Sequence, residues 1–130
     1  MFSHIMIGSN DIDRAKSFYS KVLAVLGAGE PLVDVNSTGQ TRLFYIHDGN
    51  IFSITQPING EPAGTANGTT IGLACDSPEQ VKELHDVAIA NGATAIEEPP
   101  GPREGAMGTM HLCYFLDPDG HKICGLHRAG

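Results

Sequence analysis

The segment FSHIMIGSNDIDRAKSFYSKVLAVLG, residues 2–27, sets the pattern that the rest of the chain repeats. Its first residues are mostly apolar and predict a strand over residues 2–8. Apolar side chains then recur every three or four positions, which is typical of a helix with one buried face. Two aspartates suit the N-terminus of this helix and Gly27 suits its end, so we expect it to cover about residues 10–26.

Three short strands and a linker are predicted to follow. The apolar runs over residues 32–35, 43–47 and 50–55 are typical of strands, and Asp48-Gly49 is a strong hairpin turn signal. The next stretch, residues 57–68, is rich in proline and glycine and is predicted to be a linker.

The same order of elements then starts again about 66 residues further on. The letters TIGLACDS, residues 70–77, lie over HIMIGSND, residues 4–11. A second helix is predicted over residues 77–91, and strands are predicted over residues 93–97, 109–116 and 122–127. The segment between the first two of these strands, residues 99–108, is mostly glycine and proline and is expected to be a loop.

This repeat predicts an α+β fold of two tandem βαβββ modules. Module 1 covers about residues 1–56 and module 2 about residues 69–130. The chain has 130 residues, which by length is a single domain. At this size each half buries little apolar surface alone, so the two modules are expected to pack on one another.

Charge and composition exclude several classes of protein. Eight basic and fifteen acidic residues give a net charge of −7, which argues against nucleic acid or a membrane surface as a partner. No apolar run is long enough to span a bilayer, and the first residues lack the basic start of a secretory signal, so we expect a cytoplasmic protein. Three widely spaced cysteines form neither a disulfide framework nor a zinc knuckle.

Three parts of the sequence resemble the vicinal oxygen chelate superfamily, which includes glyoxalase I, bleomycin resistance proteins and extradiol dioxygenases. These parts are His4 in the first strand, the segment DIDRAKSFYSKVL at residues 11–23, and YFLDPDGHKI at residues 114–123. The resemblance implies two modules whose curved sheets enclose a cleft. Enzymes of the family place a divalent metal there, held by histidine and glutamate, and the metal chelates two neighbouring oxygens of the substrate.

The resemblance places the family's ligand positions at His4 and Ser53 in module 1 and at Thr70 and Cys124 in module 2. Typical members have histidine where Thr70 stands and glutamate where Cys124 stands. One imidazole, one thiol and two hydroxyls are a poor set for a hard divalent ion. Two alternatives stay open: a divalent metal, zinc or another ion, held by His4 and Cys124, or no metal and a polar pocket.

Four further residues are candidates for the cleft. His111 is a candidate acid or base, and strand alternation places it on one face with Cys113. A four-residue turn over Asp117–Gly120 would pair Cys113 with Cys124, which predicts two neighbouring thiols at the floor of the cleft. The alternative is that both cysteines are small buried hydrophobic residues.

Gln56 and Arg103 are expected in loops near the ends of the cleft. Arg103 lies inside PPGPREGAMG, residues 99–108, which is long enough to act as a lid. Functional loops often carry one arginine for a carboxylate or a phosphate. The alternative is a solvated Arg103 that pairs with Glu104 or with nothing.

Two functions remain in competition. The first is a divalent-metal-dependent lyase or isomerase that acts on a substrate with vicinal oxygens. The second is a non-catalytic protein that binds and sequesters a small ligand or drug and retains only a degraded metal site. A dioxygenase is disfavoured because its two histidines and one glutamate are absent from the matching positions. Since family members often pair modules between chains, we also expect a homodimer.

Overall fold

The computed structural model describes residues 1–128. Residues 129 and 130, which the sequence analysis assigned to module 2, lie outside the described residues. Module 1 consists of β1 (Ile5–Gly8), α1 (Ile12–Val25), β2 (Leu32–Val35), β3 (Thr41–His47) and β4 (Asn50–Thr55). Module 2 consists of β5 (Ile71–Ala74), α2 (Pro78–Ala90), β6 (Thr94–Ala95), β7 (Gly101–Gly105), β8 (Gly108–Leu116) and β9 (Lys122–Arg128). The predicted α+β fold of two βαβββ modules is confirmed.

Each module forms its own sheet, and the two sheets share one plan. Sheet 1 has the order β1-β4-β3-β2, and sheet 2 has the order β5-β9-β8, with β6 and β7 both paired to β8. The first and last strands of each module run parallel, with Ile5 opposite Phe52 in sheet 1 and Ile71 opposite Ile123 in sheet 2. Ile5 and Ile71 are 66 positions apart, so the structure reproduces the spacing seen in the sequence.

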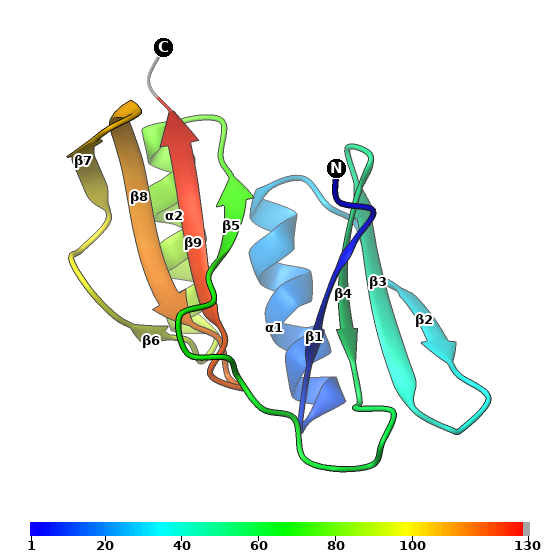
Figure 1. Ribbon diagram of the computed structural model, residues 1–130. Coiled ribbons are helices and arrows are strands. Elements are labelled where there is room, and N and C mark those ends of the chain that lie inside the picture. The colour runs from blue at the N-terminus through cyan, green and yellow to red at the C-terminus, as the bar shows by residue number, and fades with distance from the viewer. Residues whose placement is uncertain (129–130) are drawn as a thin grey trace.

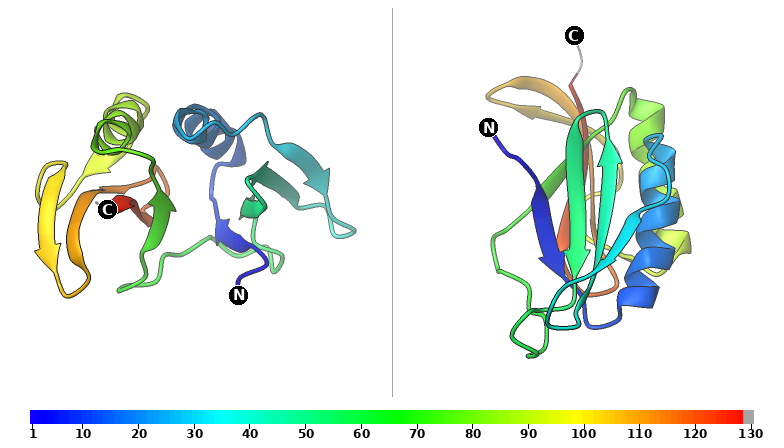
Figure 2. Two further views of the ribbon diagram at one scale, coloured as in Figure 1. Left: turned by 90° about the horizontal axis from the view of Figure 1, so that it is seen from above. Right: turned by 90° about the vertical axis from the view of Figure 1, so that its right-hand side faces the viewer.

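Both helices lie on the same side of the molecule, and the two sheets lie side by side on the other (Figures 1 and 2). α1 and α2 contact one another, and the side chain of Gln80 in α2 donates to the carbonyl oxygen of Val25 at 3.0 Å. The core fills the layer between helices and sheets, where Phe18 of α1 meets Phe115 of β8 at a centroid distance of 6.2 Å. Within residues 1–128, no helix has the length and apolar character needed to cross a membrane.

The two motifs that carry the family resemblance contact each other directly. The Tyr19 hydroxyl of α1 donates to the Asp117 carboxylate at 2.5 Å, and both groups are buried. The Asp119 carboxylate lies at the start of α1, where it accepts from the Ser9 hydroxyl at 2.7 Å and from the Asn10 main-chain N–H at 2.9 Å. A carboxylate at a helix N-terminus is stabilised by the unpaired N–H groups there. The turn of module 2 therefore holds module 1 in place.

The last hairpin differs from the predicted one by a single residue. Leu116 pairs with Lys122, so five residues form the loop and Cys113 pairs with Gly125 rather than with Cys124. The extra loop residue follows from Asp117, whose side-chain oxygen accepts from the main-chain N–H groups of Asp119 and His121, each at 2.9 Å. A shift of one residue moves a side chain to the other face of a sheet, so the expected thiol pair is wrong.

The segment over residues 99–108 also differs from the expected loop. Residues 101–105 form β7, which pairs with β8 through Gly101 opposite Leu112 and Gly105 opposite Gly108. Proline is tolerated in this strand because β7 lies at the edge of the sheet, where Pro102 needs no N–H for a further neighbour. Arg103 is therefore a strand residue and not part of a lid.

Replacement of the carboxylate at the start of α1 tests how much this contact stabilises the fold. We expect Asp119→Ala to lower the free energy of unfolding by about 2 kcal/mol, since the charged hydrogen bond to the buried Ser9 hydroxyl and those to the exposed Asn10 and Arg14 are lost. The matched control is Asp86→Ala, which removes the exposed ion pair between Asp86 and Lys82 of α2 and should cost about 0.5 kcal/mol or less. Urea unfolding measures both, and equal losses would show that the Asp119 contact contributes no more than a surface ion pair.

Candidate functional site

Sheet 1 has one face packed on α1 and one face that no helix of the described residues covers. Leu43 and Ile54 belong to the core. Side chains alternate along a strand, so Met6, Phe44 and Ser53 point the other way. We call the face formed by Met6, Phe44 and Ser53 the helix-free face of sheet 1.

Sheet 2 is divided in the same way. Phe115 and Ile123 belong to the core cluster, whereas Leu112 and Cys124 are buried but lie outside that cluster. Tyr114 is directly opposite Cys124 across β8 and β9. We call the face formed by Leu112, Tyr114 and Cys124 the helix-free face of sheet 2.

The four positions carried over from the resemblance lie on these two faces as matching pairs. Ser53 is opposite Met6 in sheet 1, and Cys124 is opposite Gly72 in sheet 2. His4 comes two residues before Met6, and Thr70 comes two residues before Gly72, so alternation places each on the same face as its neighbour. His4 and Ser53 therefore share a face of sheet 1, and Thr70 and Cys124 share a face of sheet 2, so the four positions are divided between two sheets.

Ser53 is the unusual member of the first pair. Its side chain is 0% exposed, and its hydroxyl has no hydrogen-bond partner among residues 1–128. Met6 and Phe44 flank it on the neighbouring strands. A buried hydroxyl without a partner costs about 1–3 kcal/mol. His4, by contrast, is exposed at the end of the sheet, with its Nδ1 2.7 Å from the Ser3 hydroxyl.

Cys124 lies in a small polar group on sheet 2. Burial raises the pKa of its thiol, so the thiol stays protonated at neutral pH. The Lys122 ammonium lies 4.7 Å from the centre of the Tyr114 ring beside it and forms an ion pair with Glu97. Glu97 adopts φ of 61°, a left-handed conformation that is strained for a residue with a side chain.

Cys113 and His111 lie on the opposite face of sheet 2, toward α2. A Cβ added at Gly125 would lie 2.8 Å from the Cys113 sulfur and 2.8 Å from Leu84 of α2, which shows where this thiol packs. Burial raises the pKa of Cys113 to about 12. His111 stands opposite His127, with their rings 6.3 Å apart. Neither candidate reaches the face that holds Cys124.

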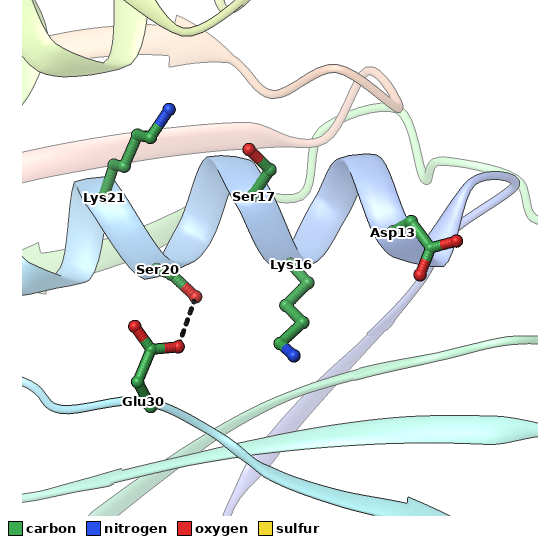
Figure 3. A pocket seen from close by; sticks show the side chains of 6 residues that line it. All are labelled: Asp13, Lys16, Ser17, Ser20, Lys21 and Glu30. Atoms are coloured by element: carbon green, nitrogen blue, oxygen red, sulfur yellow. Dashed lines mark hydrogen bonds between the residues drawn. The ribbon is translucent and has the colours of Figure 1, made fainter.

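Gln56 has a structural hydrogen bond and lines a polar hollow. Its amide oxygen accepts from the main-chain N–H of Thr41 at 2.8 Å. The hollow measures about 380 Å³ and lies between the start of the linker, the turn at Gly39 and Asn10. A second hollow of about 350 Å³ lies along the exposed side of α1, where Lys16, Lys21 and Glu30 line it (Figure 3). None of the four ligand positions lines either hollow.

The residues at the four positions do not fit a divalent metal. They supply one imidazole, one thiol and two neutral hydroxyls, whereas hard divalent ions require carboxylates and zinc requires at least three imidazole, thiolate or carboxylate ligands. Within residues 1–128, no group of three or more histidine, cysteine, aspartate or glutamate side chains is placed to hold a metal ion.

Comparison with known proteins places the chain in a family. The model of the Glyoxalase/Bleomycin resistance protein/Dioxygenase superfamily matches residues 1–124. The chain belongs to this superfamily, which confirms the resemblance seen in the sequence.

Solved structures agree with this assignment. A glyoxalase/bleomycin resistance protein from Albidiferax ferrireducens T118 is 50% identical, with a TM-score of 0.90 over 98% of this chain and 99% of that one. The fosfomycin resistance protein FosX from Listeria monocytogenes, solved with Mn(II) and sulfate, is 18% identical, with a TM-score of 0.69 over 99% of this chain and 93% of that one. At 18% identity, the likeness to FosX shows the fold alone.

Sequence reasoning missed the group around Tyr114. The motif at residues 114–123 contains both Tyr114 and Lys122, but it was interpreted only as a turn flanked by strands. The correct hairpin register places Tyr114 opposite Cys124 and would have identified it. Glu97 carried no signal, because its contact with Lys122 depends on the path of the chain between β6 and β7.

Removal of the Ser53 hydroxyl tests whether this buried group, which has no partner among the described residues, lowers the free energy of unfolding. We expect Ser53→Ala to raise the free energy of unfolding by about 1 kcal/mol, because it deletes a buried oxygen without a partner and keeps the shape. The matched control is Ser9→Ala: this serine is 2% exposed but bonded to Asp119, so its loss should be destabilising. If Ser53→Ala is as destabilising as Ser9→Ala in urea unfolding, the hydroxyl has a partner and this account of it is wrong.

Proposed function

We propose that this protein binds a small organic molecule on the helix-free faces of its sheets, through side chains and without a divalent metal at the family's ligand positions. A ligand on sheet 1 would contact Met6 and Phe44, which flank the buried Ser53, and a ligand on sheet 2 would contact the Tyr114 side chain and the Cys124 thiol. This is the non-catalytic alternative among the functions that the resemblance implies. Metal-dependent lyase or isomerase chemistry would require donors that these positions lack.

The observation that carries the proposal is the Ser53 hydroxyl. It is buried, points away from the core, and lacks a partner among the described residues. Buried polar groups in native proteins are nearly always hydrogen-bonded, so an exception at a ligand position calls for a partner, which an ordered water or a bound molecule can supply. The equivalent position on sheet 2 holds Cys124, whose thiol donates to the Gly125 carbonyl oxygen at 3.5 Å and offers a ligand a soft, largely apolar contact.

Nuclear magnetic resonance with a library of small aromatic fragments, neutral and acidic, tests this proposal. Protein dialysed against EDTA should show amide shift changes at Met6, Phe44, Tyr114 and Cys124 when a fragment binds. Addition of Mn²⁺ or Zn²⁺ should leave the affinity of that fragment unchanged, because no step of binding involves a metal. Binding that requires added metal would contradict the proposal, as would shifts confined to the two polar hollows.

We also propose that the protein forms a homodimer that covers these faces. The two sheets lie side by side and do not face each other, so neither sheet covers the helix-free face of the other (Figures 1 and 2). Large apolar side chains are exposed on sheet 1, among them Met6 at 40% and Ile46 at 61%. A second copy that covers this surface would remove apolar area from water and enclose the ligand between two chains.

Substitution of Ile46 tests the dimer. We expect sedimentation to show a dimer at micromolar concentration for the parent and a monomer for Ile46→Lys, because a charge would be placed in the apolar contact. The matched control is Ile89→Lys, which places the same change on α2, where Ile89 is 38% exposed. A monomeric parent, or equal effects of the two substitutions, would overturn the dimer proposal.

A further inference from the structure

Three lysine or arginine residues among residues 1–128 are half-buried, and one of them, Arg103, lacks a carboxylate partner. The other two half-buried cations, Arg42 and Lys122, form ion pairs with Asp34 and Glu97. Arg103 forms no ion pair within residues 1–128, although Glu104 is its neighbour in the chain. The Glu104 carboxylate instead accepts from the Thr109 hydroxyl at 2.7 Å. A positive charge is therefore left free in a chain with a net charge of −7.

The main chain holds the Arg103 guanidinium in a fixed position. Its Nη2 donates to the carbonyl oxygen of Pro99 at 2.9 Å, and its Nη1 donates to the carbonyl oxygen of Pro102 at 3.2 Å. Proline restricts the backbone, so the sequence PPGP at residues 99–102 presents these two oxygens rigidly. A guanidinium has five N–H donors, and the ones that remain are free for a ligand.

The guanidinium lies at the margin of the helix-free face of sheet 2. Gly101, two residues before Arg103, is opposite Leu112, which belongs to that face. A Cβ added at Gly101 would lie 3.6 Å from Nη1 of Arg103, so the guanidinium lies over the glycine. Tyr114 follows Leu112 two residues further on, about 7 Å along β8. A ligand seated on Tyr114 can therefore reach Arg103.

From this geometry we infer that Arg103 forms an anion subsite for the ligand. The molecule bound would carry a carboxylate or a phosphate on a small apolar body. The oxyanion would accept from the free N–H groups of Arg103, and the apolar body would contact the Tyr114 side chain. This inference rests on the proposed function, because it names the class of molecule that the helix-free face of sheet 2 accepts.

The other free cations do not form an equivalent site. Lys16 and Lys21 line the hollow on α1, but Figure 3 shows their ammonium groups extending to opposite sides of the helix. Neither ammonium forms an ion pair or a hydrogen bond within residues 1–128 that would fix its position, unlike the Arg103 guanidinium with its two carbonyl oxygens. Two mobile and divergent lysines recognise no particular anion, whereas a fixed guanidinium fork matches the geometry of a carboxylate or phosphate.

A pair of probes of the same shape isolates this subsite. Benzoate and benzamide share an aromatic body, and only benzoate carries a negative charge. We expect the protein to bind benzoate about ten-fold more tightly than benzamide. One charged hydrogen bond contributes at least that difference in affinity. Inorganic phosphate in a second arm shows whether the subsite accepts phosphate as well as carboxylate. Amide shifts at Gly101, Arg103 and Tyr114 locate the bound probe.

Three variants complete the test. Arg103→Gln should remove the preference for benzoate while benzamide binds as before, and Arg103→Lys should keep a reduced preference because it retains charge but not the fork. The control Lys16→Gln removes one positive charge elsewhere and should leave the preference unchanged. Thermal unfolding of each variant without probes separates loss of the subsite from loss of the fold.

The outcomes separate this inference from the proposed function. If benzoate and benzamide bind to the helix-free face with equal affinity, the anion subsite is wrong and the proposed function stands. A preference for benzoate that Lys16→Gln reduces as much as Arg103→Gln would also overturn the inference, since it would reflect general charge attraction. If neither probe shifts the residues of the helix-free faces, the proposed function itself fails.

Discussion

The contact between the Asp117–Gly120 turn and α1 is the interaction on which the arrangement of the two modules depends. Asp117 accepts the Tyr19 hydroxyl in the core, and Asp119 accepts donors at the helix N-terminus. The His121 ring adds a contact with the Gly8 carbonyl oxygen at 2.7 Å. These contacts fix the helices side by side behind the two sheets (Figure 1). One consequence is that the helix-free faces stay free for other roles.

The elements and the repeat were predictable because short-range patterns encode them. The helical periodicity from Ile12 onward and the capping serine at Ser77 mark both helices in the local sequence. The turn at Asp117–Gly120 was also predictable, and so were the two segments that contain it and Tyr19. What the patterns could not show was that these two motifs touch each other, because 98 residues separate Tyr19 from Asp117 in the chain.

The errors have a common physical origin in long-range contacts. Asp117 uses one carboxylate oxygen for its own turn and the other for Tyr19, and this double role lengthens the hairpin loop by one residue. That single residue separates Cys113 from Cys124. β7 was missed because proline and glycine disfavour strands, yet pairing with β8 stabilises it at the sheet edge. The candidate site was located only through the resemblance, and its missing carboxylates were evident from the sequence alone.

A double-mutant cycle on Tyr19→Phe and Asp117→Asn tests most directly whether this motif pair joins the modules. The two single variants and the double variant are compared by their free energies of unfolding in urea. The account predicts a coupling energy of about 2 kcal/mol, as expected for a buried hydrogen bond to a carboxylate. A coupling below about 0.5 kcal/mol would show that the two residues act independently and would contradict the account.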